Sequence, residues 1–327
     1  MGLASKLEHG VAFVRARALG HRLPLVVSVV VTNRCNFSCG YCDRWDGSGR
    51  RLDTAELETL IRDMAGLGTR RLILTGGEPL TRKDLPDLID LAVSLGMKVN
   101  LNSNGVLVPR FIDRLGGLSG LTISLDGDRH VHDGIRGEGA FDAVVAALRA
   151  ARPLPGLKLR LNAVMSAQSL GAEDALLDLA RAEGVEVFFQ PAEHRILGSM
   201  ERNPLAPEVV PYRETIDHLI AEKRKGAPIA NSLSALEYLR GWPDAPALRC
   251  AGGYLFCRVD HDGRLMICGR MGEYEESFDA VALGFAEAFH RLSPARCPTC
   301  WCASRVEVNQ AFALQPDAIF GLAGGLG

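Results

Sequence analysis

The chain has 327 residues, 47% of them apolar, which is enough for a large core and one or two domains. Its 37 basic and 39 acidic residues leave a net charge of −2, so the composition favours no nucleic-acid partner. No apolar run reaches the roughly 18 residues of a membrane-spanning helix, and no signal peptide opens the chain. We therefore expect a cytoplasmic protein.

Residues 3–20 predict a short basic amphipathic helix, within an N-terminal segment at 1–24. One face carries apolar residues and the basic residues lie elsewhere; the apolar face consists of Leu3, Leu7, Val11, Val14 and Ala18. Two interpretations stay open. The helix docks on the main domain, or it lies on a membrane surface and meets a lipid substrate there.

Three of the nine cysteines have the spacing C-x3-C-x2-C, directly after the apolar run 25–31; they are Cys35, Cys39 and Cys42. Three thiolates in so compact an arc can hold three irons of a cubane. Clusters that only carry electrons use four protein thiolates. No other cysteine occurs in the next 207 residues, so one iron would be left for a non-protein ligand. The alternative is zinc, which takes four ligands, or three and a water.

A second motif, Gly76-Gly77-Glu78-Pro79, follows the next predicted strand, and Tyr41 directly precedes the third cysteine. Together these motifs resemble those of the radical S-adenosylmethionine (radical SAM) superfamily. The resemblance implies a [4Fe–4S] cluster on the three cysteines, whose open iron chelates the amino and carboxylate groups of SAM. It implies an external reductant, flavodoxin or ferredoxin, and cleavage of SAM to a 5′-deoxyadenosyl radical. Residues 76–79 would lie along the methionine moiety, and Tyr41 beside the adenine.

Strand and helix patterns alternate between residues 25 and 200. The strand-like runs are rich in Val, Ile and Leu, as in strands buried on both faces: Leu25–Thr32, Arg71–Leu74, Lys98–Asn102, Leu121–Leu125, Lys158–Met165 and Val185–Gln190. The helical patterns are Thr54–Ala65, Arg82–Leu95, Arg110–Leu115, Phe141–Ala151 and Ala172–Glu183. Asp53 and Glu56 predict a capping box, and Gly66 and Gly96 predict helix ends. The order predicts an α/β fold, a partial (βα)6 barrel of the TIM type.

In such barrels the chemistry lies at the carboxyl ends of the strands, where this chain places polar residues. By resemblance, four of them contact SAM: Asn104, Ser124, Asp126 and Arg136. The alternative is ordinary turn chemistry, and for Arg136 a pairing with Asp133. A second set faces the expected substrate space: Asn162, Gln190, Glu193 and His194.

Residues 201–247 predict a helical bridge, with helices at Tyr212–Arg224 and Ser232–Leu239. The remaining six cysteines lie between 250 and 302. Tyr254–Val259 and Arg264–Ile267 flank a turn signal and predict a hairpin. Cys250 and Cys268 would lie at the open ends of this hairpin, close enough to share a metal.

This arrangement resembles the C-terminal cluster-binding extensions of radical SAM enzymes, the SPASM type and its shorter twitch version. The resemblance implies one auxiliary [4Fe–4S] cluster, and so two clusters in all, within a domain at 248–310 that precedes an apolar tail at 311–327. The implied ligands are Cys250, Cys268, Cys297 and Cys300, with Cys257 and Cys302 as alternatives. A structural zinc ribbon is the competing interpretation.

We therefore predict a radical SAM enzyme that abstracts hydrogen from a substrate C–H. Oxidation of a small biosynthetic intermediate fits the one-cluster module. The alternatives are C–C or C–S bond formation on a lipid, isoprenoid or peptide. A protein of another class, which binds an iron–sulfur cluster or zinc without catalysis, would have no use for residues 76–79.

Overall fold

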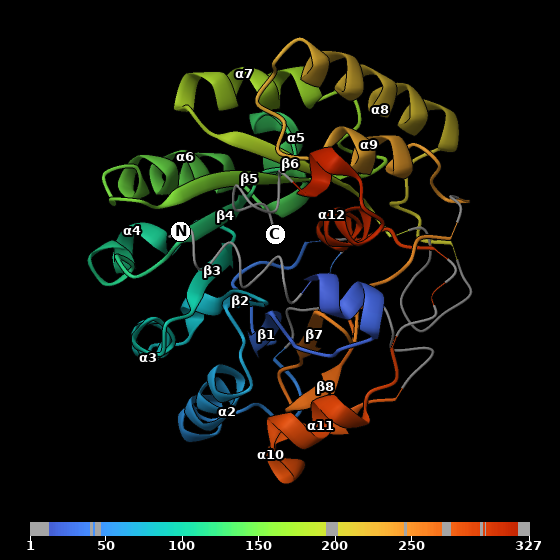
Figure 1. Cartoon of the computed structure of the whole chain (residues 1–327). Coiled ribbons are helices and arrows are strands. Elements are labelled where there is room, and N and C mark those ends of the chain that lie inside the picture. The colour runs from blue at the N-terminus through green and yellow to red at the C-terminus, as the bar shows by residue number, and fades with distance from the viewer. Residues whose placement is uncertain are drawn as a thin grey trace.

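Six parallel strands form the main body of the computed structural model, which describes residues 13–39, 42, 47–193, 202–244, 247–269, 276–294, 297 and 299–319. The strands are β1 (Val26–Thr32), β2 (Arg71–Gly76), β3 (Lys98–Ser103), β4 (Gly120–Ser124), β5 (Lys158–Met165) and β6 (Glu186–Pro191). They pair in the order β6-β5-β4-β3-β2-β1 as a curved sheet (Figure 1). The predicted partial barrel is confirmed.

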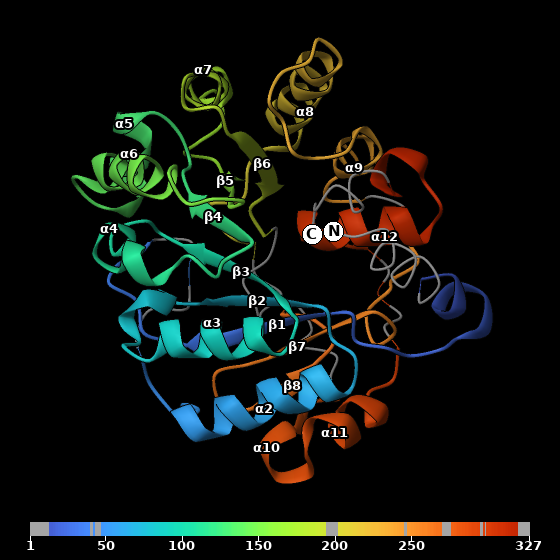
Figure 2. The same ribbon diagram turned by 60° about the vertical axis from the view of Figure 1, so that its left-hand side comes forward.

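Helices cover the outer side of this sheet (Figure 2). They are α2 (Thr54–Gly66), α3 (Leu85–Ser94), α4 (Val108–Phe111), α5 (Arg129–Arg136), α6 (Ala140–Ala151) and α7 (Glu173–Glu183), with short 3-10 turns at Pro79–Thr81 and Ile112–Arg114. The predicted capping box is present, because Asp53 accepts from the backbone N–H of Glu56 and Glu56 accepts from that of Asp53. The helix predicted from Arg82 begins only at Leu85, because Arg82 is extended and ends the preceding 3-10 turn.

Alternation along the strands separates a core face from an inner face. Val99 and Leu101 of β3 are fully buried under the helices, whereas the alternate residues Asn100 and Asn102 are not. Residues paired in register point to the same face of a sheet. Asn102 pairs with Thr122, and Thr122 pairs with Arg160, so all three belong to the inner face. Polar side chains of β3, β4 and β5 thus lie side by side on the inner face of the half barrel.

The predicted hairpin is present but is part of the barrel sheet. Its strands are β7 (Phe256–Val259) and β8 (Arg264–Met266), and β9 (Phe278–Asp279) follows. β7 pairs with β1 in parallel, so within the described residues one sheet of nine strands continues from β6 to β9. The sequence predicts the hairpin but not this pairing.

The open side of the half barrel faces a helix that the sequence analysis did not predict, α12 (Ala303–Phe312) (Figure 2). Its side chains are almost all buried, including Glu307 and Asn309. Asn309 accepts the N–H of Ala251, and Glu307 accepts the N–H of Ser232, which caps α9 (Leu233–Leu239). The predicted bridge helices are confirmed, the longer being α8 (Val209–Arg224), whereas α10 (Ala280–Leu283) and α11 (Phe285–Arg291) were not predicted.

The N-terminal helix is described at residues 13–19, and the rest of its predicted range lies outside the described residues. Val14 and Ala18, predicted for the apolar face, are exposed, so that part of the prediction is wrong. The reason is that Phe13 and Arg17 hold the helix: the Phe13 ring packs edge-on against Phe312, and Arg17 donates to the Phe312 carbonyl. In the described part of the chain, no helix is long and apolar enough to cross a membrane.

Candidate active site

The three cysteines of the first motif lie on the loop that leaves β1. Cys39 is buried, and Cys35 and Cys42 are half-buried. The backbone N–H of Cys42 donates to the Cys39 carbonyl at 3.0 Å, and the N–H of Phe37 points at the Cys35 sulfur at 3.4 Å. These hydrogen bonds link Cys39 with Cys42 and fix the backbone that follows Cys35.

The Cys42 thiol lies near enough to Cys35 and Cys39 to influence the pKa of both. Burial raises the pKa of Cys35, and nearby Glu78 and Cys42 raise it further. Burial likewise raises the pKa of Cys39, with contributions from Cys42 and Cys35. Among the described residues, no three His, Cys, Asp or Glu side chains lie close enough to hold a single metal ion.

The segment Gly76–Pro79 braces this loop through its backbone. The N–H of Gly77 donates to the Thr32 carbonyl at 2.8 Å, and that of Glu78 donates to the Arg34 carbonyl at 2.9 Å. Gly76 ends β2 with φ +155°. A Cβ at Gly76 would lie 2.2 Å from the Thr32 carbonyl oxygen. The glycine is therefore needed for the close approach of two chain segments just before Cys35.

We expect Gly76→Ala to lower the free energy of unfolding by at least about 3 kcal/mol, because backbone must move to admit the methyl group. Gly66→Ala is the matched control, since a Cβ there meets nothing within 4 Å. That substitution should be neutral or stabilise by up to about 1 kcal/mol. Urea unfolding of both variants checks the prediction, and a Gly76→Ala protein as stable as the wild type would contradict it.

Glu78 is fully buried and connects the loop to β3. Its carboxylate accepts from the Asn104 N–H at 2.7 Å, the Leu80 N–H at 3.1 Å and the Ser103 hydroxyl at 3.0 Å. Asn104 in turn donates through its side chain to Asn36 at 2.7 Å, beside Cys35. Burial outweighs these hydrogen bonds and raises the pKa of Glu78 from 4.5 to about 7.

This raised pKa predicts a pH-dependent stability. The folded protein keeps the Glu78 proton between about pH 4.5 and 7, where the unfolded chain has lost it, so stability is lost as pH rises through 7. A shift from 4.5 to about 7 corresponds to about 3 kcal/mol. The stability of the Glu78→Gln variant should not change with pH in this way. The variant should be less stable than the wild-type protein at low pH, because its amide NH2 group would face a backbone N–H donor.

The measurement is anaerobic urea unfolding of the wild type and Glu78→Gln at several pH values between 5 and 8. All other titrating groups are common to both proteins, so the difference between the two curves isolates Glu78. Parallel curves would show that Glu78 titrates at its ordinary value.

A second buried network lies next to Cys39. Arg136 donates to the Asp126 carboxylate at 2.7 and 3.3 Å, and the N–H of Val164 donates to the same carboxylate at 3.1 Å. Burial alone raises the pKa of Asp126, but the Arg136 guanidinium outweighs it and leaves the pKa below its ordinary value. Asp133 accepts the N–H groups of Gly139 and Phe141 instead, so the alternative pairing of Arg136 with Asp133 is wrong.

The network includes a histidine that the sequence analysis did not single out as functional. His132 is fully buried in α5, and its Nδ1 accepts the N–H of Asp126 at 3.1 Å. Burial and, to a smaller extent, Arg136 lower the pKa of His132 to about 4, so the ring is neutral at pH 7. The proton is then on Nε2, a buried nitrogen without a hydrogen-bond partner. Its only sequence signal was its place in the polar segment after β4.

The other predicted residues fall on the inner face or outside the described residues. Ser124 of β4 pairs in register with Asn162 of β5, and Gln190 lies one step further along, opposite Val164. Glu193 follows β6, and its carbonyl accepts from the Asn203 side chain at 2.9 Å. Tyr41 and His194 lie outside the described residues, and their roles stay predictions.

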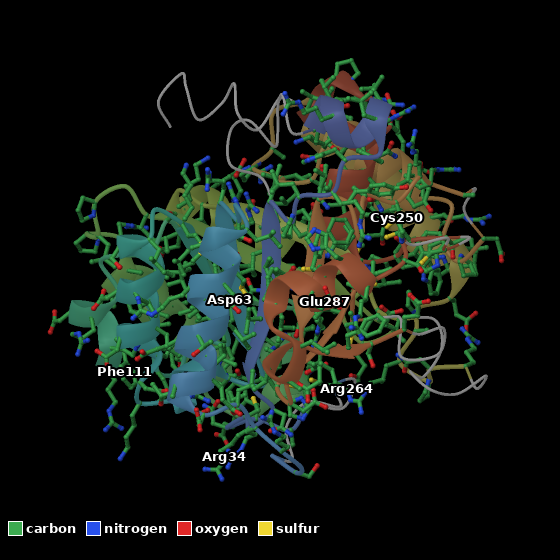
Figure 3. All side chains as sticks on the ribbon, turned by 60° about the horizontal axis from the view of Figure 1, so that its bottom comes forward. Arg34, Asp63, Phe111, Cys250, Arg264 and Glu287 are labelled. Carbon is green, nitrogen blue, oxygen red and sulfur yellow. The ribbon has the colours of Figure 1, made fainter. Side chains whose placement is uncertain are left out.

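The second set of cysteines lies apart from the first. Cys250 is distant from Arg34, the neighbour of Cys35, in Figure 3. Burial raises the pKa of Cys250, and the nearby Cys268 thiol raises it further, as expected for two thiols at the open end of one hairpin. Cys300 donates its N–H to the Tyr238 hydroxyl at 3.1 Å, which anchors its loop to α9.

The two alternative ligands differ in their surroundings. Cys257 is fully buried in β7 opposite Val27, and burial raises the pKa of its thiol to about 12. Such a thiol behaves as a small core residue. Cys302 is half-buried at the N-cap of α12, with its sulfur 3.3 Å from the Ser304 hydroxyl.

The fold and the site together define a half-barrel protein with a three-thiol loop at the carboxyl end of its first strand. Residues 29–156, which include the three-thiol loop, match the Radical SAM superfamily, and this part of the chain belongs to that superfamily. It is 35% identical to the Fe-coproporphyrin III synthase of Methanosarcina barkeri (strain Fusaro / DSM 804) over 204 residues, 60% of this chain and 50% of the synthase. The chain therefore spans about half the length of that relative.

Two further comparisons cover more of the chain. It is 28% identical to the PqqA peptide cyclase of Rhodopseudomonas palustris (strain ATCC BAA-98 / CGA009) over 90% of this chain and 85% of the cyclase. The crystal structure of Streptococcus suis SuiB bound to S-adenosylmethionine superposes with a TM-score of 0.65 at 17% identity, covering 84% of this chain and 67% of SuiB. At that identity the likeness shows the fold, and it includes the region of the C-terminal hairpin.

Proposed function

We propose that this chain is an enzyme that reductively cleaves SAM and uses the 5′-deoxyadenosyl radical to remove a hydrogen atom from a substrate C–H. The observation that carries the proposal is the loop of three neighbouring thiols, Cys35, Cys39 and Cys42, braced by the backbone of residues 76–79. A [4Fe–4S] cluster, when bound to these thiolates, supplies the electron for the cleavage.

The surrounding residues bind and orient SAM. Asn104 lies beside Cys35 and Asp126 with Arg136 lies beside Cys39, so fixed polar groups flank the thiols on both sides. Their side chains are held by the buried Glu78 and His132 networks, which keep them in one orientation. Ser124 and Asn162 extend this polar surface toward the substrate. Preorganised groups of this kind limit competing reactions of the radical.

We further propose that Cys250, Cys268, Cys297 and Cys300 hold an auxiliary [4Fe–4S] cluster. This cluster would accept one electron from the substrate after hydrogen abstraction. The substrate then loses one hydrogen atom to the deoxyadenosyl group, one electron to the cluster and one proton to a base, a net two-electron oxidation. Such chemistry suits a small biosynthetic intermediate, and the resemblance to a synthase of a small molecule supports this substrate class.

Bond formation on a peptide is the second candidate, because the match to a peptide cyclase covers 85% of that relative. A lipid or isoprenoid substrate at a membrane surface remains the third alternative. The reductant in each case is a flavodoxin or ferredoxin, and we place the enzyme in the cytoplasm.

The test is to reconstitute the wild-type protein anaerobically, add SAM and dithionite, and measure 5′-deoxyadenosine and metal content. Release of 5′-deoxyadenosine with about eight irons per chain supports two cubanes, and about four supports the first cluster alone. Zinc in the C-terminal module would overturn the auxiliary-cluster proposal. Absence of 5′-deoxyadenosine from an iron-loaded protein would overturn the proposed activity.

A further inference from the structure

Four basic side chains gather at the amino ends of the barrel strands, the end opposite to the cysteine loop. Arg71 begins β2, Lys98 begins β3, and Lys158 and Arg160 lie at the start of β5. Arg71 and Lys98 are partners in register. The four residues, named the basic floor below, alternate with core residues such as Leu72, Val99 and Leu161, so they belong to the inner face.

The cations of the basic floor lie near one another. Burial lowers the pKa of Arg71, and Arg160 lowers it further. Burial also lowers the pKa of Lys98, to which Arg71 and Lys158 both contribute. Like charges brought together at a partly buried site repel one another and destabilise the fold. Such an arrangement is stabilised when an anion binds between them.

Arg160 carries a buried hydrogen-bond donor, its Nε–H. Its side chain is 17% exposed, and its Nε–H is buried without an acceptor among the described residues. Two carboxylates lie near it: Glu186 at 4.0 Å, and Glu307 of α12. Glu307 uses one oxygen for the Ser232 N–H, and its other oxygen has no hydrogen-bond partner. Neither carboxylate accepts the Arg160 Nε–H, and a buried donor without an acceptor destabilises the fold.

We propose that the basic floor binds a carboxylate group of the substrate, and hence that the substrate of this enzyme is an organic acid. The inference rests on the proposed function and names its substrate class. A guanidinium presents two parallel N–H groups from its Nε edge, which match the two oxygens of a planar carboxylate.

The distance between the basic floor and the SAM site indicates the length of the substrate. Val164, whose N–H binds Asp126 beside Cys39, lies four residues after Arg160 in the same strand. At about 3.3 Å per residue the two levels are roughly 13 Å apart. A substrate anchored at Arg160 would therefore have to span up to roughly 13 Å along the inner face to place its reacting carbon near the SAM site.

The test measures binding of the tricarboxylate tricarballylate to the cluster-loaded enzyme in the presence of SAM, by isothermal titration calorimetry. Wild type should bind tricarballylate, and Arg160→Gln should weaken binding at least about tenfold, the worth of one charge-assisted hydrogen-bonded pair. Arg160→Lys should recover part of this loss because it restores the charge. Arg114→Gln, which removes an exposed arginine on the outer side, should bind as wild type does.

Two comparison probes separate carboxylate recognition from general anion binding. The neutral triamide of the same acid should not bind, and inorganic phosphate should bind more weakly than tricarballylate. Equal affinities of the wild type and Arg160→Gln, or binding of phosphate in preference to the carboxylate, would overturn the inference. Circular dichroism of Arg160→Gln and Arg160→Lys confirms that lost binding is not lost folding.

The binding assay is independent of catalysis, so the two proposals fail separately. SAM cleavage by the wild type without Arg160-dependent binding would overturn the organic-acid inference and leave the radical activity standing. Arg160-dependent binding without SAM cleavage would overturn the proposed activity and leave a carboxylate site.

Discussion

Simultaneous replacement of Cys35, Cys39 and Cys42 by alanine is expected to abolish release of 5′-deoxyadenosine from SAM under dithionite. The physical reason is that the three thiols are neighbours on one loop and are the donors available there for the first cluster. Without them no reduced cluster forms next to the SAM site, and the loss should be at least about a thousandfold. The product is measured by chromatography after anaerobic incubation.

Cys257→Ala is the matched control, because it also removes a thiol but from the core between β1 and β7. It should lower the free energy of unfolding by about 1–2 kcal/mol and retain SAM cleavage. Persistent release from the triple variant would show that the first motif does not hold the catalytic cluster. If a folded Cys257→Ala protein released no 5′-deoxyadenosine, Cys257 would have to be counted among the cluster ligands.

Cys268→Ala is expected to lower the iron content from about eight to about four per chain while the protein still cleaves SAM. Cys268 lies beside Cys250 and far along the chain from the first motif, so its removal should open only the auxiliary site. Iron is measured by a colorimetric assay after anaerobic reconstitution, and cleavage by 5′-deoxyadenosine release. Product formation from any identified substrate should stop, because its radical would lack an electron acceptor.

Cys302→Ala separates the two possible ligand sets of the auxiliary site. If Cys250, Cys268, Cys297 and Cys300 are the ligands, this variant keeps about eight irons. A drop to about four would place Cys302 among the ligands. Full iron in Cys268→Ala would contradict the auxiliary-cluster proposal for the hairpin.

Sequence patterns predicted the barrel because its signals are local. The apolar runs that became β1 to β6 needed no knowledge of the fold, and neither did Asp53 and Glu56, whose capping box depends on residues three positions apart. The C-x3-C-x2-C spacing is also local, and the N–H of Cys42 donates to the Cys39 carbonyl within the same loop.

Contacts between distant segments could not be predicted in this way. No local pattern indicates that β7 pairs with β1, more than two hundred residues earlier, or that α12 faces the inner side of the barrel. Residues 76–79 were predicted to lie along the methionine moiety of SAM, but no pattern indicated that the Glu78 carboxylate accepts from Ser103 and Asn104 after β3. Only packing decides which partner a buried carboxylate finds.

The amino-acid sequence alone determined the superfamily, the strand order of the half barrel and the three cysteines of the first loop, because each depends on residue type and spacing within one segment. The tertiary structure alone decided that Arg136 pairs with Asp126, that Cys257 belongs to the core, and that four cations share the floor of the barrel. The places of Cys257 and of the four cations depend on register between strands, which brings together residues from about ninety to more than two hundred positions apart and has no signature in any one of them.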